Sequence, residues 1–330
     1  MIRVAINGFG RIGRVFTRAL ENHPAINLIA INDLADTATM AHLIKYDSVH
    51  GRFHGTVDHT ETEVILNGTP IKAFHEKDPA NLPWADLNID FVVECTGFFL
   101  TRELAQKHIT AGAKKVIISA PAKDADIKTV VLGVNESILN DTDTIISNAS
   151  CTTNAVSPMI KILSEIAEIE TIYISTIHSY TNDQRLHDAP HKDLRRARAG
   201  ALSIVPTTTG AAKAITKIFP ELKGKVEGGA IRVPVPDGSL IDICAVIKNN
   251  ITVEQINAAF KKAANNQLKG ILEYTEDEIV SIDIVGNSHS CIFDAQLTTV
   301  IGNMVKIVGW YDNEAGYSNR LIDLIEKISK

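Results

Sequence analysis

The chain has 330 residues, of which 45% are hydrophobic and 22% are charged, and its formal net charge at pH 7 is −6. This length accommodates about two domains, and the composition is that of an ordinary globular protein without repeats or low-complexity tracts. The negative charge argues against nonspecific nucleic-acid binding, and no apolar run approaches the length of a membrane span.

The cellular compartment follows from the N-terminus and the cysteines. The chain enters a strand and a glycine loop at once, which leaves no room for a signal peptide. Its four cysteines are far apart and include no Cys-x-x-Cys pair, so we expect neither a disulfide framework nor a metal site; they are Cys95, Cys151, Cys244 and Cys291. We therefore expect a cytoplasmic protein in a reducing compartment.

Residues 2–7 are predicted to form a strand that leads into a glycine-rich loop, Gly8-Phe9-Gly10-Arg11-Ile12-Gly13, and then into an amphipathic helix. This is the order of a dinucleotide-binding unit. Gly8 permits the tight turn, Gly10 lets backbone N–H groups approach a pyrophosphate, and Gly13 allows the helix to pack closely on the strand.

A second predicted strand, residues 26–32, ends at Asp33, twenty residues after Gly13. A carboxylate at that position can accept hydrogen bonds from both hydroxyls of an adenosine ribose and would repel a 2′-phosphate. The pattern therefore favours NAD over NADP. A glycine turn followed by an ordinary surface aspartate is the alternative, and the agreement of strand, loop, helix and spacing argues against it.

The rest of the first half predicts a helix at 37–47, a hairpin at 64–71 on an Asn-Gly turn, and two continuous apolar strands at 91–95 and 115–118. Ligands of parallel sheets bind beyond the carboxyl ends of the strands. We therefore expect three residues that follow these strands to border the cofactor: Thr96, Gly97 and Ser119. Cys95 is expected to be a small core residue.

Cys151 follows the apolar strand 144–146 and begins a helical apolar pattern, so the first domain should close near residue 150. The N–H groups and the dipole of a helix start favour negative charge, so we expect a lowered pKa and a nucleophilic thiolate at Cys151. The hydroxyls of Ser150, Thr152 and Thr153 suit helix capping, an oxyanion or a phosphate. A capped helix with a small core cysteine is the alternative reading of this stretch alone.

A strand at 169–177 ends at His178. A lone histidine after a strand is more often structural, but an imidazole is also the partner that a thiolate needs and the base that a hydroxyl needs. Residues 184–200 are too charged for a core and predict a functional or interface loop, with a solvated basic surface as the alternative.

The second half predicts an α+β domain. Residues 206–210 open a helix at 211–218 and form a second threonine- and glycine-rich helix start able to bind an anion. The remaining predicted elements are strands at 230–235, 240–248, 279–284 and 305–311, a helix at 252–265 and a final helix to residue 328. Arg232 is the one cation in its strand, so it needs an anionic partner, either an internal carboxylate or a ligand.

Six motifs together resemble the phosphorylating glyceraldehyde-3-phosphate dehydrogenase family, and they occur in family order over nearly the whole chain. They are Asn-Gly-Phe-Gly-Arg-Ile-Gly at 7–13, Ser-Cys-Thr-Thr-Asn at 150–154, His-Ser-Tyr-Thr at 178–181, Pro-His-Lys-Asp-Leu-Arg-Arg-Ala-Arg-Ala at 190–199, Thr-Gly-Ala-Ala-Lys at 209–213 and Trp-Tyr-Asp-Asn-Glu at 310–314.

The resemblance implies roles for individual residues. Cys151 would be the nucleophile and His178 the base. The residues implied to contact NAD are Arg11, Ile12, Asp33, Lys77, Ser119 and Asn313. One phosphate site, for inorganic phosphate, would be lined by Ser150, Thr152, Thr209 and Gly210, and the site for the phosphate of the substrate by Thr181, Arg196 and Arg232.

The resemblance also implies an architecture and a reaction. A Rossmann-type parallel-sheet domain at 1–150 would bind NAD, a catalytic α+β domain with a mainly antiparallel or mixed sheet would span 151–313, and a C-terminal helix at 314–330 would pack back on the first domain. The chain would form homotetramers and convert D-glyceraldehyde 3-phosphate and inorganic phosphate to 1,3-bisphosphoglycerate through a hemithioacetal and a thioester. Ala189 stands where many NAD-specific members have leucine, although Asp33 and Pro190 still favour NAD.

Three alternatives remain at this point. An erythrose-4-phosphate dehydrogenase would share the nucleophile, the base and the cofactor fold. A Cys-His hydrolase would leave residues 2–33 without a role. A binding or scaffold protein on a dehydrogenase fold would be expected to have lost Cys151, His178 or Arg232, and the chain retains all three.

Overall fold

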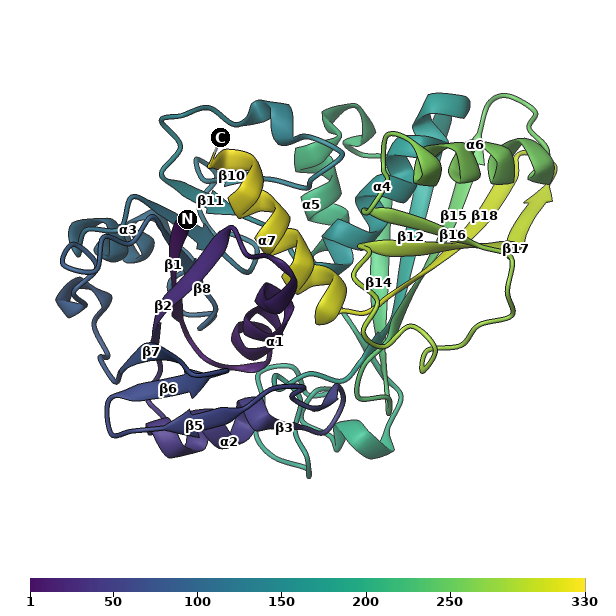
Figure 1. Cartoon of the computed structure of the whole chain (residues 1–330). Helices are drawn as coiled ribbons and strands as arrows, with labels where there is room; N and C mark the ends of the chain where they lie inside the picture. Colours follow the sequence, from purple (N-terminus) through teal and green to yellow (C-terminus); the bar gives the residue numbers. More distant parts are fainter. Residues whose placement is uncertain (330) are drawn as a thin grey trace. The chain divides into compact units, whose positions relative to one another are not determined.

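The computed structural model describes residues 1–329, and their contacts divide the chain into two units (Figure 1). The first unit comprises Met1–Ser150 and the chain from Ser318 onward, and the second comprises Cys151–Tyr317. Residue 330, which the expected final helix included, lies outside the described residues.

The first unit is built on a nine-stranded sheet in the order β10-β11-β9-β8-β1-β2-β7-β6-β5. The strands from β10 to β7 pair in parallel, and β6 and β5 extend the sheet antiparallel. The strands are β1 (Ile2–Asn7), β2 (Ile26–Asn32), β5 (Val57–His59), β6 (Glu63–Leu66), β7 (Thr69–Phe74), β8 (Phe91–Glu94), β9 (Lys115–Ile118), β10 (Lys128–Thr129) and β11 (Ile145–Ser147). A separate two-stranded sheet joins β3 (Tyr46–Asp47) to β4 (Gly51–Arg52).

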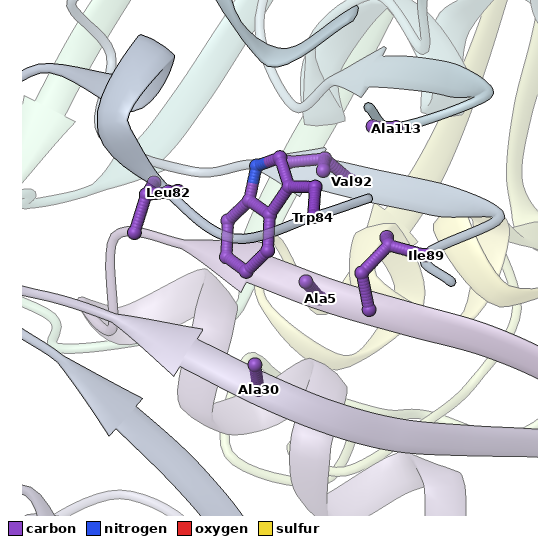
Figure 2. Packing of buried hydrophobic residues seen from close by; sticks show 7 residues of the cluster. All are labelled: Ala5, Ala30, Leu82, Trp84, Ile89, Val92 and Ala113. Atoms are coloured by element: carbon purple, nitrogen blue, oxygen red, sulfur yellow. The ribbon is translucent and has the colours of Figure 1, made fainter. Parts of the chain in front are cut away.

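The central strands of this sheet are apolar because helices pack against it, and β8 is buried along its whole length. The helices of the first unit are α1 (Arg11–Ala19), α2 (Thr37–Lys45), α3 (Arg102–Thr110) and most of α7 (Ala315–Ile328). On one side, the buried indole of Trp84 packs among apolar side chains of β1, β2 and β8 (Figure 2). Ala5, Ala30 and Val92 lie on these strands, and Leu82, Ile89 and Ala113 complete the cluster from segments outside them.

Two glycines of the first loop have the roles that the sequence predicts. Gly8 adopts φ +95°, and a Cβ there would lie 2.7 Å from the backbone nitrogen of Thr96, so the ends of β1 and β8 approach closely. A Cβ at Gly13 would lie 2.5 Å from the carbonyl oxygen of Gly8 and 3.2 Å from Ile6, which confirms the close packing of helix on strand.

The second unit is built on a seven-stranded mixed sheet in the order β13-β14-β12-β15-β18-β17-β16. Its strands are β12 (Ile169–Ser179), β13 (Val205–Thr207), β14 (Val226–Val233), β15 (Ser239–Ile247), β16 (Leu272–Thr275), β17 (Cys291–Ile301) and β18 (Met304–Tyr311). Only the β12–β14 and β16–β17 pairs of this sheet are parallel. The two sheets together confirm the expected fold class.

One face of the second sheet is covered by α4 (Cys151–Ile166), α5 (Ala211–Ile218) and α6 (Val253–Asn265), as Figure 1 shows. Burial alternates along β12 and β15 accordingly, because successive side chains of a strand point to opposite faces. Side chains on the other face, such as Tyr173 and Ile231, are exposed.

Three expectations for the second unit are wrong. Residues 279–284 form turns and not a strand, because Val280 and Ile282 point to solvent and only Ile284 is buried. The strand ending at residue 177 continues through His178 to Ser179, and β14 starts at Val226 and not at residue 230. Within residues 1–329, no helix is long and apolar enough to cross a membrane.

Candidate active site

Cys151 is the first residue of α4, immediately after the turn that follows β11. In that turn the non-glycine residue Ala149 adopts φ +57°, in the left-handed region. The turn places Cys151 at the helix start, where the sequence predicted it. The residue is half-buried, and its Sγ lies 3.5 Å from Nε2 of His178.

The proton position on His178 follows from its second ring nitrogen. Nδ1 lies 2.7 Å from the carbonyl oxygen of Ser179, which can only accept a hydrogen bond. Nη1 of Arg232, which can only donate, lies 2.8 Å from the same Nδ1, so the two contacts call for opposite tautomers, and the shorter one, to Ser179, favours the proton on Nδ1. In that tautomer the lone pair of Nε2 faces the sulfur of Cys151. This is the arrangement in which His178 can take a proton from the thiol or from a substrate hydroxyl.

The pKa values of this pair differ from the sequence-based expectation. Burial raises the pKa of the Cys151 thiol, although the charge of Arg232 and hydrogen bonds from Thr152 act in the opposite direction. Burial and then the neighbouring Arg232 lower the pKa of His178 to about 3. The expected lowering at Cys151 is thus wrong, because the desolvation of a thiolate outweighs the helix start. At neutral pH the pair is a thiol beside a neutral imidazole.

Arg232 lies directly beside His178, because the two residues are paired in register on the parallel strands β12 and β14. Its Nη1 donates to the Ser179 carbonyl oxygen at 2.9 Å and lies 2.8 Å from Nδ1 of His178. Among the described residues, the buried Nε of Arg232 has no hydrogen-bond partner. An unmatched guanidinium donor beside the Cys151–His178 pair suits an anionic ligand group.

Arg196 brings a second cation toward the same place, because its charge also contributes to lowering the pKa of His178. Its guanidinium forms an ion pair with Asp183 and donates to Oγ1 of Thr207 at 2.9 Å. The charged loop around residues 184–200 therefore presents at least one arginine toward His178.

Tyr311, at the end of β18, is a site residue that the sequence analysis missed. Its hydroxyl lies 3.1 Å from Oγ1 of Thr152 and 2.9 Å from Oγ1 of Thr176. Its ring meets that of His178 edge to face, with centroids 5.8 Å apart. Tyr311 thus links the start of α4 to β12, and only its place in the Trp-Tyr-Asp-Asn-Glu motif pointed to it.

The other predicted phosphate residues lie at chain turns. Gly210 is the residue that precedes α5, and Oγ1 of Thr209 accepts a hydrogen bond from the backbone N–H of Ala211 at 3.2 Å. Helices α4 and α5 contact each other, so the two predicted anion-binding helix starts belong to neighbouring helices. Thr181 lies in the turn after β12, and Ser150 directly precedes Cys151.

A cavity of about 540 Å³ lies in the first unit at the carboxyl ends of its parallel strands. Five of the predicted cofactor residues line it, namely Gly8, Gly10, Asp33, Lys77 and Thr96. Six further lining residues were not predicted from the sequence, namely Asn7, Asn32, Leu34, Glu76, Phe98 and Phe99. Leu34 and Phe98 are exposed apolar side chains, which suits contact with the flat face of an aromatic base.

Cys95 also lines this cavity and is half-buried, so the expectation of a plain core residue is wrong. Burial of the sulfur raises the pKa of Cys95 to about 12, so the thiol stays protonated and unreactive.

The remaining predicted cofactor residues are outside the lining of this cavity. Arg11 donates through Nη1 to Asp47 at 2.6 Å, and the half-buried Ile12 follows it at the start of α1. Gly97 adopts φ +75° beyond the end of β8. Ser119 follows β9, and its backbone N–H donates to the carbonyl oxygen of Glu94 at 2.9 Å.

Asn313 belongs to the second unit and has its amide oriented by two serines. Its Oδ1 accepts hydrogen bonds from Oγ of Ser179 at 2.8 Å and from Oγ of Ser239 at 2.7 Å. With the oxygen engaged in this way, the amide NH₂ is the part of Asn313 that remains to donate to a ligand.

Comparison with known proteins covers both units. Residues 2–102 match the model of the glyceraldehyde 3-phosphate dehydrogenase NAD binding domain, and residues 150–313 match that of the C-terminal domain of the same family. The chain is 57% identical over 326 residues to glyceraldehyde-3-phosphate dehydrogenase 2 of Streptomyces avermitilis, covering 98% of this chain and 97% of that protein. It is 56% identical over 333 residues to glyceraldehyde-3-phosphate dehydrogenase of Thermotoga maritima, covering both chains completely.

The protein of that name from Geobacillus stearothermophilus is 54% identical over 330 residues, with 99% of this chain and 98% of the relative covered. The chain therefore belongs to the glyceraldehyde-3-phosphate dehydrogenase family and is an NAD-dependent oxidoreductase.

Proposed function

We propose that this member of the family oxidises D-glyceraldehyde 3-phosphate to 1,3-bisphosphoglycerate, with NAD as the hydride acceptor and inorganic phosphate as the second substrate. The observation that carries the proposal is the 3.5 Å approach of Cys151 Sγ to His178 Nε2, with the cationic Arg232 directly beside the imidazole. A nucleophile, a base and an anion anchor are the three groups that the oxidation of an aldehyde phosphate to a thioester requires.

The first step uses the thiol and the imidazole together. Nε2 of His178 takes the proton of the Cys151 thiol as sulfur adds to the aldehyde carbon, and this overcomes the raised pKa of the thiol. The developing oxyanion is stabilised by His178 and by the backbone N–H of Cys151 at the helix start. Return of the proton gives a neutral hemithioacetal and frees Nε2 for the next step.

In the second step, His178 takes the hydroxyl proton of the hemithioacetal as hydride leaves the carbon. Bound NAD supplies the acceptor for that hydride. A thioester remains on Cys151, and the oxygen of inorganic phosphate then attacks its carbonyl carbon and expels the sulfur. Sulfur is needed because a thioester stays reactive enough for this attack, whereas the oxygen ester of a serine is too stable.

The phosphate of the substrate would bind Arg232, Arg196 and Thr181. The buried, unmatched Nε of Arg232 and the nearby charge of Arg196 support this assignment. Inorganic phosphate would bind the two helix starts, through Ser150, Thr152, Thr209 and Gly210.

NAD would bind the first unit, which makes residues 1–150 a cofactor domain and residues 151–313 a catalytic domain, with the C-terminal helix belonging to the first. The cavity at the strand ends supports this, because Gly8, Gly10, Asp33, Lys77 and Thr96 line it. Arg11, Ile12, Gly13, Gly97, Ser119 and Asn313 would complete the contacts.

We also propose a homotetramer in the cytoplasm. Large apolar side chains of the second unit point to solvent, and exposed apolar surface is the kind that a contact between subunits covers. They include Tyr173 at 53% exposure on the uncovered sheet face, and Leu194 and Leu202 at 82% and 81% near the charged loop. Sedimentation at increasing enzyme concentration tests the assembly, and a monomer at all concentrations would refute it. The four cysteines are free, and free cysteines are typical of a reducing compartment, which supports the proposed location.

The decisive experiment for the proposed function is the formation of NADH from glyceraldehyde 3-phosphate, followed by ultraviolet absorbance. The rate should depend on added inorganic phosphate, and arsenate should replace phosphate because it attacks the same thioester. NADH formation at an undiminished rate without either anion, beyond the first turnover, would refute the phosphorylating reaction.

A further inference from the structure

Five buried polar side chains form a continuous row in the first unit, running from its apolar core to the cofactor cavity. In order they are Trp84, His108, Glu94, Asn7 and Asn32, and each is at most 4% exposed. Asn32, Asn7 and Glu94 are the last residues of β2, β1 and β8 and are paired with one another in register. We call these five residues the polar row.

The first link of the polar row determines the proton position on His108. Nε1 of Trp84 donates to Nδ1 of His108 at 3.1 Å, and an indole N–H cannot accept. Nδ1 therefore carries the lone pair, and the proton of the neutral imidazole is on Nε2. In Figure 2 the blue nitrogen of Trp84 lies on the side of the indole away from Ala30 of the apolar cluster.

The second link is a fully engaged carboxylate. Oε2 of Glu94 accepts from Nε2 of His108 at 3.1 Å and from Nδ2 of Asn7 at 2.6 Å. Oε1 accepts from the backbone N–H of Thr96 at 2.7 Å and from its hydroxyl. All four groups face the two carboxyl oxygens as donors.

The third link orients two amides that line the cavity. Because Nδ2 of Asn7 faces Glu94, its Oδ1 is left to accept from Nδ2 of Asn32 at 2.7 Å. Asn32 then holds the backbone of Glu76 from both sides, donating to its carbonyl oxygen at 2.9 Å and accepting from its N–H at 2.8 Å. Glu76 and the next residue, Lys77, line the cavity together with Asn7, Asn32 and Thr96.

We propose that Glu94 and His108 are positioning residues for the cofactor. The Trp84 indole can only donate, and the hydrogen bonds of His108 and Glu94 therefore fix the orientation of the Asn7 and Asn32 amides. These amides in turn hold the Glu76–Lys77 backbone, and Glu94 holds Thr96, in the positions that receive the dinucleotide. This inference rests on the proposed binding of NAD in that cavity. Neither residue lines the cavity itself, so they act through the residues that do.

Stability does not account for the polar row. A buried carboxylate carries a desolvation cost that an apolar side chain of similar volume would not, and fully paired buried networks are often replaceable by apolar residues without loss of stability. What apolar residues would not supply is a direction for each amide. Reversal of the Asn7 amide would place its oxygen against the Glu94 carboxylate and its NH₂ against that of Asn32.

Glu94→Gln tests the proposal, because glutamine keeps the shape but must turn an NH₂ toward either Thr96 or the pair of His108 and Asn7. We expect the Kd of NAD, measured by titration calorimetry, and the KM of NAD to rise about tenfold, from one frustrated buried hydrogen bond. The kcat at saturating NAD, the KM of glyceraldehyde 3-phosphate and the rate of Cys151 alkylation without NAD should change less than about twofold.

Ile89→Ala is the matched control, because Ile89 is fully buried and packs with Trp84 in the apolar cluster but its side chain makes no hydrogen bond in the polar row. It should lower the Tm and leave the Kd of NAD unchanged. Trp84→Phe keeps an aromatic ring and removes only the N–H donor. Because the indole then no longer fixes the tautomer of His108, we expect the Kd of NAD to rise about threefold.

Three results would overturn the inference: a Kd of NAD in Glu94→Gln within twofold of wild type, an equal loss of affinity in Ile89→Ala, or an unchanged Kd in Trp84→Phe. Measurement of the Kd of NAD for wild-type enzyme alongside the variants distinguishes a failure of this inference from a failure of the proposed function. If wild type does not bind NAD, the proposed cofactor site fails, and if it binds NAD but the variants bind equally well, only the polar row fails.

Discussion

His178→Asn should change how the stability of the enzyme depends on pH. In the folded enzyme the pKa of His178 is lowered from its ordinary value of 6.5 to about 3, by burial first and by Arg232 second. Between pH 7 and pH 5 the unfolded chain therefore takes up a proton at this residue and the folded chain does not. Because only the unfolded state takes up this proton, a lower pH favours unfolding, and the free energy of unfolding of wild type decreases as the pH falls.

The size of this effect follows from the two pKa values. An unfolded histidine is almost fully protonated at pH 5 and about a quarter protonated at pH 7, and this proton binding lowers the free energy of unfolding by about 2 kcal/mol over that interval. Asparagine does not titrate, and its NH₂ can replace Nδ1–H as donor to the carbonyl oxygen of Ser179. The free energy of unfolding of wild type minus that of the variant should thus fall by about 2 kcal/mol between pH 7 and pH 5.

Urea unfolding followed by circular dichroism at both pH values, at one protein concentration, measures this difference. Other titrating groups are shared by both proteins and cancel. A difference that stays constant within about 0.5 kcal/mol would mean that His178 is protonated in the folded enzyme, and the argument for a neutral base with a free Nε2 lone pair would fail. The variant should also lose about 100-fold or more in kcat, since it has no group to take the hydroxyl proton.

Three further substitutions test separate parts of the site. Cys151→Ser should abolish acyl-phosphate formation while NAD still binds; acyl phosphate made at the wild-type rate would remove Cys151 from the mechanism. Arg232→Lys keeps the charge but loses the forked donors, so the KM of glyceraldehyde 3-phosphate should rise about tenfold or more with the Kd of NAD unchanged, and an unaltered KM would contradict a phosphate contact there. Asp33→Ala should raise the KM of NAD and reduce the preference for NAD over NADP by about tenfold or more in kcat/KM ratios, and an unchanged ratio would show that Asp33 does not select the cofactor.

Much of the fold could be predicted because local pattern and tertiary burial agree in it. Residues 2–7 and 26–32 form the strands β1 and β2 with the expected limits, since both are apolar runs in a parallel sheet covered by helices. The strand predicted at residues 279–284 is absent for the opposite reason. Their alternating isoleucines and valine look like a half-buried strand, but no neighbouring strand pairs with them, and only Ile284 is buried.

The site was predictable where a residue type and its local position define its chemistry. Cys151 at a helix start and His178 near a strand end were found in this way, and the structure brings their side chains together. The pKa of Cys151 was not predictable, because it depends on how deeply the folded unit buries the sulfur. Leu34, Glu76 and Phe98 were missed as cavity residues since they come from separate segments that meet only in the folded unit.

The pairing of His178 with Arg232 has a consequence for substrate choice. A strand cannot slip by one residue without turning its side chains to the wrong face of the sheet, so the spacing between the base and the guanidinium is as rigid as the backbone itself. If Arg232 binds the phosphate of the substrate as proposed, this fixed spacing sets the distance between the reacting carbon and the phosphate. A longer aldehyde phosphate would then have to bend to reach both His178 and Arg232.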